Sequence, residues 1–205
     1  MTPTGISFPT VRLLGAAEKL RAEVREFLSA EVAAGTFSPR CDSWLGDYSP
    51  KFSHKLGERG WLGMTWPKRY GGHERSALER FVVTEELLAA GAPVASHWIA
   101  DRQSGPSILR YGTEEQKKRF LPAIARGECF FSIGMSEPES GSDLASVRTS
   151  AERVHGGWRV NGTKIWTGGA HRSHYAIVLC RTSPPDEKDR HAGLSQLILA
   201  SRPRA

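Results

Sequence analysis

The spacing of apolar residues changes once along this chain, near Glu128, and that change limits the folds it can adopt. Upstream, apolar residues recur every three or four positions within several stretches, which indicates amphipathic helices. Downstream, they alternate with polar residues or form short unbroken runs, which indicates strands. We therefore expect an α+β fold with an all-α helical domain over residues 1–127 and a β-domain over 128–205.

About five helices are expected in the first domain. They cover residues 14–34, 50–56 behind the N-cap Ser49, 77–90 behind Ser76, 94–111 with a break or kink at Pro106, and the segment after the capping box at Thr113, which Pro122 makes short or irregular. Between the second and third helices, Trp61 and Trp66 lie in a segment rich in Gly and Pro. We expect both indoles to anchor the core rather than to contact a ligand, because large aromatic side chains supply much of the buried area.

The second domain is expected to be a partial antiparallel β-barrel. Its predicted strands lie at residues 129–135, 147–151, 158–160, 164–166, 175–180 and 194–200, with an exposed loop at 182–193. His155-Gly156-Gly157 and Asn161-Gly162 are the predicted turns, and Asn-Gly is a strong hairpin signal. The barrel is expected to be incomplete, which would leave open strand edges.

Composition excludes several classes of protein. The net charge of +6 over 205 residues suits a polyanionic partner, but the scattered basic residues disfavour nucleic acid. Three widely spaced cysteines indicate reduced thiols, and the His and Cys spacing fits no common zinc motif. Neither a transit peptide nor a membrane-spanning stretch is recognisable, so we expect a cytoplasmic location.

Two polar stretches in the second domain are candidates for a binding site. Gly134–Ser146 combines small residues, hydroxyls and carboxylates after a predicted strand, so its N–H groups and hydroxyls could face an anion or the polar edge of a ring. Composition alone favours a solvated turn. The second stretch, Thr163–His171, follows the Asn-Gly signal.

Together these stretches resemble the acyl-CoA dehydrogenase family of flavoproteins. The pattern small-aliphatic-Ser/Thr-Glu-x-x-small-Gly-Ser/Thr-Asp-x-x-small is met from Gly134 to Ser146, and a Lys-x-Trp motif is met by Lys164 and Trp166. Further similar segments are Gly60–Gly63, Pro67–Gly72, Tyr111–Lys117 and Leu121–Glu128. The resemblance extends over nearly the whole chain from about Leu14, and the similar segments follow one another in the same order as in the family.

The resemblance implies a site for FAD and for the thioester end of an acyl-CoA. The implied cofactor-binding residues are Ile133, Gly134, Met135, Ser136, Gly141, Ser142, Trp166, Thr167 and Gly168. Ser136 is expected to hydrogen-bond the polar edge of the isoalloxazine, and Ser142 to contact the acyl-CoA. Trp166 is expected to pack beside the flavin's dimethylbenzene ring, the alternative being an indole that fills the barrel.

Glu137 and Asp143 raise the question of acid/base catalysis, because two nearby loop carboxylates could face one site. We do not assign them that role. Turn carboxylates most often accept hydrogen bonds from backbone N–H groups, and in the family these residues shape the loop. We expect the same here.

The implied reaction is FAD-dependent oxidation of an acyl-CoA to a 2-enoyl-CoA, placed in fatty acid metabolism. A carboxylate takes the α proton while a hydride leaves the β carbon, and an electron-transferring flavoprotein accepts the electrons. In the family, a helical C-terminal domain supplies this carboxylate and the oligomer interface. Because that domain is expected to be absent from the 205 residues, no catalytic residue is assigned, and the activity of the isolated chain stays in doubt.

Two further expectations follow. The family's Ser or Thr near flavin N5 is replaced by Gly168, which brings the affinity for FAD into question. The chain is expected in a homo- or hetero-oligomer, and the alternatives to an enzyme are a non-catalytic partner subunit, an inactive truncated remnant and a binding module without flavin.

Overall fold

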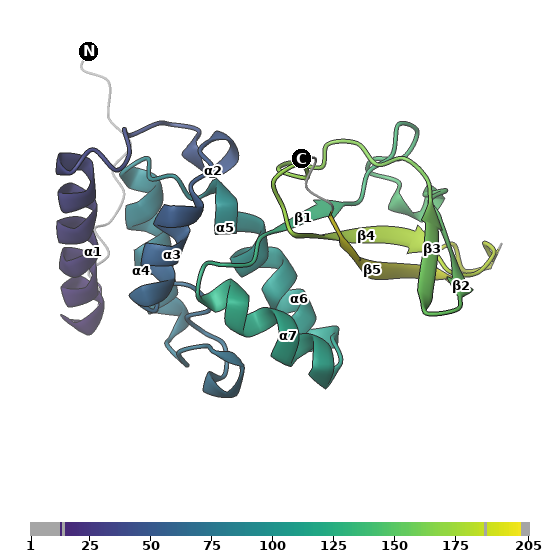
Figure 1. Ribbon diagram of the computed structural model, residues 1–205, viewed down its shortest axis with the longest axis horizontal. Coiled ribbons are helices and arrows are strands. Elements are labelled where there is room, and N and C mark those ends of the chain that lie inside the picture. The colour runs from purple at the N-terminus through teal and green to yellow at the C-terminus, as the bar shows by residue number, and fades with distance from the viewer. Residues whose placement is uncertain (1–12, 14, 187, 202–205) are drawn as a thin grey trace, which may run out of the picture.

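The computed structural model describes residues 13, 15–186 and 188–201, and it separates the chain into a helical half and a sheet half (Figure 1). The last α-helix ends at Ala125 and the first strand begins at Phe131. This arrangement confirms the α+β fold.

The helices follow the predicted pattern closely. They are α1 (Gly15–Ala33), α2 (Ser43–Gly46), α3 (Pro50–Glu58), α4 (Ala77–Ala89), α5 (Ala95–Ile99), α6 (Gly105–Tyr111) and α7 (Glu114–Ala125), with a π-helical segment at Ala100–Ser104. The capping residues Ser49, Ser76 and Thr113 each accept a hydrogen bond from a backbone N–H in the first turn, as predicted. Leu14, where the first helix was expected to begin, lies outside the described residues, and the short α2 was not predicted.

The two helix prolines interrupt the helices less than expected. Pro106 is the second residue of α6, and the π-helical segment Ala100–Ser104 joins α5 to α6 without a gap, so the helical run passes through the proline with one wider turn before it. Pro122 lies inside α7, which nevertheless continues to Ala125. Where a break or kink was predicted at Pro106, the structure therefore has a local change of helical pitch.

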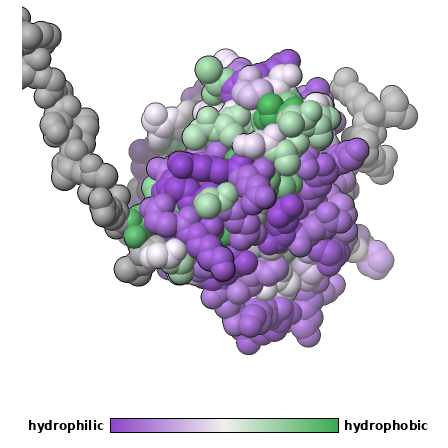
Figure 2. Space-filling model, turned by 90° about the vertical axis from the view of Figure 1, so that its left-hand side faces the viewer, coloured by the Kyte–Doolittle hydropathy of each residue, from purple (hydrophilic) through white to green (hydrophobic). Residues whose placement is uncertain are grey.

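One hydrophobic cluster holds α1, α3 and α4 together. It includes Val24, Phe52, Leu56 and Val82, none of which is exposed, and Phe27, which meets Trp61 edge to face at 5.3 Å. The opposite face of α1 carries charged side chains, and the end of the molecule on the α1 side is largely hydrophilic (Figure 2).

A second hydrophobic cluster crosses from the helices to the sheet. Trp66, Phe120 and Leu121 from the helical half pack with Phe131 and Ile177 from the sheet half. Since Trp66, like Trp61, is only 3% exposed, both indoles are core anchors, as predicted. The two halves thus share a core.

The sheet is built around one central strand. Its strands are β1 (Phe131–Gly134), β2 (Ser150–Val154), β3 (Gly157–Asn161), β4 (Tyr175–Arg181) and β5 (Leu194–Ala200). β5 pairs antiparallel with β4 along its whole length, so β1 and β2 share the other edge of β4, both parallel to it. β3 pairs antiparallel with β2. The sheet is therefore mixed and not closed as a barrel, whereas an antiparallel arrangement was expected.

The hairpin predicted at Asn161-Gly162 is wrong. The β2–β3 hairpin turns at His155-Gly156, where Gly156 has a φ of +81°. After Asn161 the described chain forms no strand before Tyr175. Instead, Ile165 donates its N–H to the carbonyl of Ser136 at 3.0 Å, so the Lys-x-Trp segment packs on the loop after β1.

Candidate functional site

Glu137 fixes the shape of the loop after β1. Its carboxylate accepts the N–H groups of Arg148 at 2.7 Å and Thr149 at 2.9 Å, across the base of the loop. Burial raises the pKa of this carboxyl, but the hydrogen bonds from these N–H groups and from Lys164 outweigh burial and lower the pKa to about 2. Glu137 is thus an ionised structural anchor, as predicted.

Lys164 joins the second polar stretch to the first. Its ammonium group donates to the carbonyl of Met135 and to Glu137 Oε1, each at 2.9 Å. The side chains of Lys164 and Glu137 are only 11% and 8% exposed, so this ion pair is screened little by solvent. Both sequence motifs therefore belong to one structural unit.

Asp143 shapes the loop by different contacts from those predicted. Its carboxylate accepts hydrogen bonds from Arg190 Nη2 at 2.8 Å and Ser146 Oγ at 2.5 Å, and no backbone N–H group of the described residues donates to it. The hydrogen bond from Ser146, followed by that from Arg190, lowers the pKa of Asp143. Asp143 thereby links the loop after β1 to the loop between β4 and β5.

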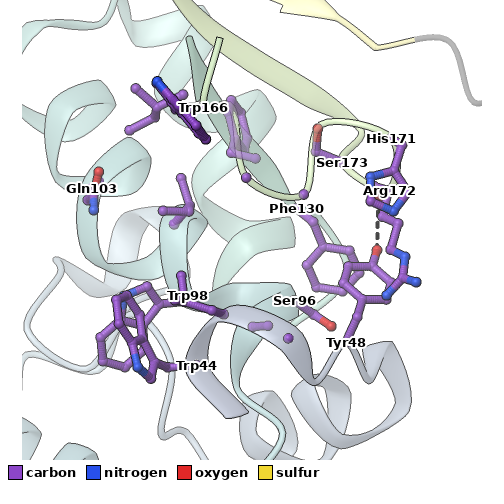
Figure 3. A pocket seen from close by; sticks show the side chains of 18 of the residues that line it. Trp44, Tyr48, Ser96, Trp98, Gln103, Phe130, Trp166, His171, Arg172 and Ser173 are labelled. Atoms are coloured by element: carbon purple, nitrogen blue, oxygen red, sulfur yellow. Dashed lines mark hydrogen bonds between the residues drawn. The ribbon is translucent and has the colours of Figure 1, made fainter. Parts of the chain in front are cut away.

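A cavity of about 530 Å³ lies where the two halves meet (Figure 3). Its helical wall comes from α2, α5 and the segments around them, and its sheet wall comes from β1 and residues 165–173. Apolar side chains dominate this lining: Trp44, Leu45, Trp98, Ile99, Phe130, Phe131, Ile133, Met135, Ile165 and Trp166. Ligand sites commonly have such apolar walls with a few polar groups.

The structure brings five of the predicted site residues into this cavity: Ile133, Met135, Ser136, Trp166 and Gly168. Gly134 and Thr167 are adjacent in the chain but do not line it. Gly141 and Ser142 are exposed and also lie outside the lining. The part of the loop nearest β1 therefore faces the cavity, and the more distal part faces solvent.

Trp166 has an unusual backbone and an exposed indole. Its φ is +57°, in the left-handed region that non-glycine residues rarely adopt, and the residue is 89% exposed. An indole this exposed does not fill the interior of the sheet. The strained conformation instead presents the ring at the cavity mouth.

Sequence reasoning missed the helical wall. Trp44, Tyr48, Ser96, Trp98 and Gln103 line the cavity, yet they lie far from the polar stretches in sequence and share no motif with them. His171, Arg172 and Ser173 complete the sheet wall, and among the described lining residues Arg172 carries the one full charge. These three residues lie at or just after the end of the predicted site segment Thr163–His171, and that position is the sequence signal that could have identified them.

The fold combines a helical half and a sheet half, and residues from both halves line this cavity. Residues 16–128 match the family model for the N-terminal domain of acyl-CoA dehydrogenase, and residues 132–204 match that for its middle domain. The chain belongs to the acyl-CoA dehydrogenase family.

Curated and solved relatives agree with this assignment. Acyl-CoA dehydrogenase FadE26 of Mycobacterium tuberculosis is 38% identical over 187 residues, covering 89% of this chain and 46% of the relative. A structure titled Tcur3481-Tcur3483 steroid ACAD has a TM-score of 0.81 and 38% identity, covering 94% of this chain and 49% of that one. The ChsE4-ChsE5 complex from Mycobacterium tuberculosis has a TM-score of 0.78 and 37% identity, covering 94% of this chain and 48% of that one. The chain thus spans about half the length of these relatives.

One solved relative carries the cofactor of the family. A glutaryl-CoA dehydrogenase from Mycobacterium smegmatis, in complex with FADH2, has a TM-score of 0.72 at 26% identity, covering 92% of this chain and 46% of that one.

Within the described residues, no helix is both long and apolar enough to cross a bilayer, and no cluster of His, Cys, Asp and Glu has the makeup of a metal site.

Proposed function

We propose that this chain provides the flavin loops and part of the substrate site for FAD-dependent oxidation of an acyl-CoA to a 2-enoyl-CoA. One observation carries the proposal: a single cavity joins the loop after β1, the Lys-x-Trp segment and the α2–α5 wall. The Glu137–Lys164 pair holds the first two together. The proposed cofactor residues remain Ile133, Gly134, Met135, Ser136, Gly141, Ser142, Trp166, Thr167 and Gly168.

The chemistry of the cavity fits an isoalloxazine. Such a ring needs apolar surface on its face and directed hydrogen-bond partners along one edge. Ile133, Met135 and Trp166 offer the apolar surface, while Ser136 and the backbone of Gly168 offer polar groups. When bound, FAD would supply the acceptor for a hydride. The residues of this chain would bind it, orient it and exclude water.

We propose a bulky, fused-ring acyl group as the substrate. One solved relative is titled a steroid ACAD, and the helical wall here is broad and aromatic, with Trp44 and Trp98 at 6.0 Å between ring centroids. Gly46 and Ala95 add little volume to that wall. For the coenzyme A portion, we propose that Ser142, on the exposed part of the loop, is the contact.

The proposed partners complete the site. We propose that the α proton is removed by a carboxylate from a helical domain outside these 205 residues, and that an electron-transferring flavoprotein takes up the electrons in the cytoplasm. A homo- or hetero-oligomer would place that helical domain beside the cavity. A second candidate is a non-catalytic subunit paired with another chain, and the two-chain complex among the solved relatives favours it. An inactive truncated remnant is the remaining alternative.

The first test is an FAD titration of the purified chain, followed by the visible absorbance of bound flavin. We expect saturable binding. The variant Gly168→Ser should bind roughly 2- to 10-fold more tightly, because a new hydroxyl adds about one hydrogen bond and a Cβ at Gly168 meets nothing within 4 Å. The absence of bound flavin in both proteins would refute the proposed cofactor role.

A further inference from the structure

Tyr48 occupies a connecting position between the two halves of the molecule. It lies between α2 and α3, next to the N-cap Ser49 of α3 and to Asp47, whose carbonyl accepts the N–H of Ala95 at the start of α5. Two helices therefore hold the Tyr48 backbone. Its side chain is half-buried and reaches across the end of the cavity (Figure 3).

The Tyr48 hydroxyl donates to the carbonyl of Arg172 at 2.7 Å. The Arg172 guanidinium also lies over the Tyr48 ring, 5.2 Å from its centroid, and Phe130 meets the ring edge to face at 5.8 Å. Burial raises the pKa of Tyr48, with Arg172 opposing the shift, so the phenol stays a neutral donor at physiological pH. The contact thus fixes both the ring and its hydroxyl.

Arg172 ends the turn that begins at Trp166. Within the turn, Gly168 donates its N–H to the carbonyl of Trp166, and Arg172 and Ser173 both donate to the carbonyl of Gly169. The turn contains two glycines, which restrict the backbone least, and a left-handed tryptophan, whose strained conformation needs contacts elsewhere to hold it. Beyond the turn, Ser173 Oγ donates to Ser132 Oγ at 3.0 Å, which attaches it to β1. The Tyr48 contact attaches the turn to the helical half.

We propose that Tyr48 is a positioning residue, which holds residues 166–173 in the conformation that receives the flavin ring. It acts through the Arg172 carbonyl. The docking of the two halves does not depend on it, since Phe120, Phe131 and Ile177 form a shared core elsewhere. Loss of the hydroxyl should therefore loosen the turn and leave the fold intact. This inference rests on the proposed flavin function.

The test compares the full chain with its Tyr48→Phe variant, which keeps the ring and removes only the hydrogen bond. In the ligand-free proteins, hydrogen exchange of the amides at 168–173 should be roughly 5-fold faster in the variant, which corresponds to one hydrogen bond. The dissociation constant for FAD should rise by about the same factor. The visible circular dichroism of bound flavin should also change, a signature that a stability effect would not produce.

Tyr111→Phe is the matched control. Tyr111 is 77% exposed and its hydroxyl has no hydrogen-bond partner within the described part of the chain, so none of these quantities should change. Unchanged exchange in Tyr48→Phe would overturn the inference. Faster exchange with unchanged FAD affinity would reduce Tyr48 to a structural contact and also overturn it. A wild-type chain that binds no FAD would refute the proposed function itself, and the positioning role with it.

Discussion

At the scale of single residues, the buried Glu137–Lys164 pair determines how the site is held. Truncating one partner of such a pair leaves the other charge buried without compensation, which costs more than the pair contributes by its formation. The neighbouring N–H groups of Arg148 and Thr149 would also lose their anionic acceptor. The loop after β1 should therefore be sensitive to a change of one atom.

We predict that Glu137→Gln lowers the free energy of unfolding by about 3 kcal/mol at pH 7. The folded pKa of Glu137 is about 2, below its ordinary value of 4.5, so its stabilisation is complete above pH 4.5 and is lost as the pH falls toward 2. The difference in unfolding free energy between wild type and variant should therefore shrink as the pH falls from 4.5 toward 2. Urea denaturation at several pH values measures it.

Glu152→Gln provides the control for this experiment. Glu152 forms an exposed pair with Arg159 at 2.9 Å, so its substitution should change stability by less than about 1 kcal/mol at any pH. Equal effects of the two substitutions at pH 7 would contradict the anchoring role of Glu137.

The role of Glu137 was predictable from the sequence, because a carboxylate in a turn usually accepts backbone N–H groups. The partners of Asp143 were not, since Arg190 lies in a loop far along the chain. The same holds for Tyr48 and Arg172, whose contact joins segments with no common motif. Local chemistry identifies the type of role, and only the fold identifies the partner.

At the scale of elements, the junction between α5 and α6 is closely packed on Trp66. A Cβ at Gly105 would lie 2.3 Å from Trp66 Cη2 and 2.9 Å from the carbonyl of Ala100. The π-helical segment before Gly105 changes the pitch here, and Gly105 lets the helix approach the indole. This glycine is therefore a packing requirement and not a flexible joint.

Gly105→Ala should destabilise the protein by about 1–3 kcal/mol, because overpacking outweighs the better helix propensity of alanine. Thermal unfolding followed by circular dichroism measures the effect. Gly141→Ala is the comparison, since a Cβ at Gly141 meets nothing within 4 Å. A Gly105→Ala protein as stable as wild type would show that Trp66 repacks without cost.

Helix positions were predictable because caps and periodicity are local signals, and Ser76 and Thr113 cap their helices as the sequence indicates. The failure at Asn161-Gly162 has a tertiary cause. Lys164 and Ile165 find partners in the loop after β1 rather than in β3. The parallel pairing of β1 with β4 is likewise set by distant segments. We keep the division of the domains at 127/128 as a prediction.

At the scale of the whole molecule, the shared core should make the two halves unfold together. Phe120 of α7 lies 5.6 Å from Phe131 of β1 and 4.9 Å from Tyr175 of β4, measured between ring centroids. These aromatic contacts bridge the halves. Because both halves contribute to this core, we expect them to unfold as one cooperative unit.

Phe131→Ala should remove about 3–5 kcal/mol from the unfolding free energy. Native-state hydrogen exchange should show the slowest amides of α7 and β4 losing protection by the same amount, because both depend on the same core. A loss confined to β4 would mean that the helical half is stable by itself.

The arrangement on β4 also has a consequence for how such a chain can diversify. β1 ends opposite Val178 and β2 begins opposite Arg181, so the two ends of the intervening loop are about 10 Å apart on one strand edge. Insertions or deletions between those ends would change the length of the loop without shifting the register of either strand. Ligand preference could therefore evolve there at little risk to the sheet.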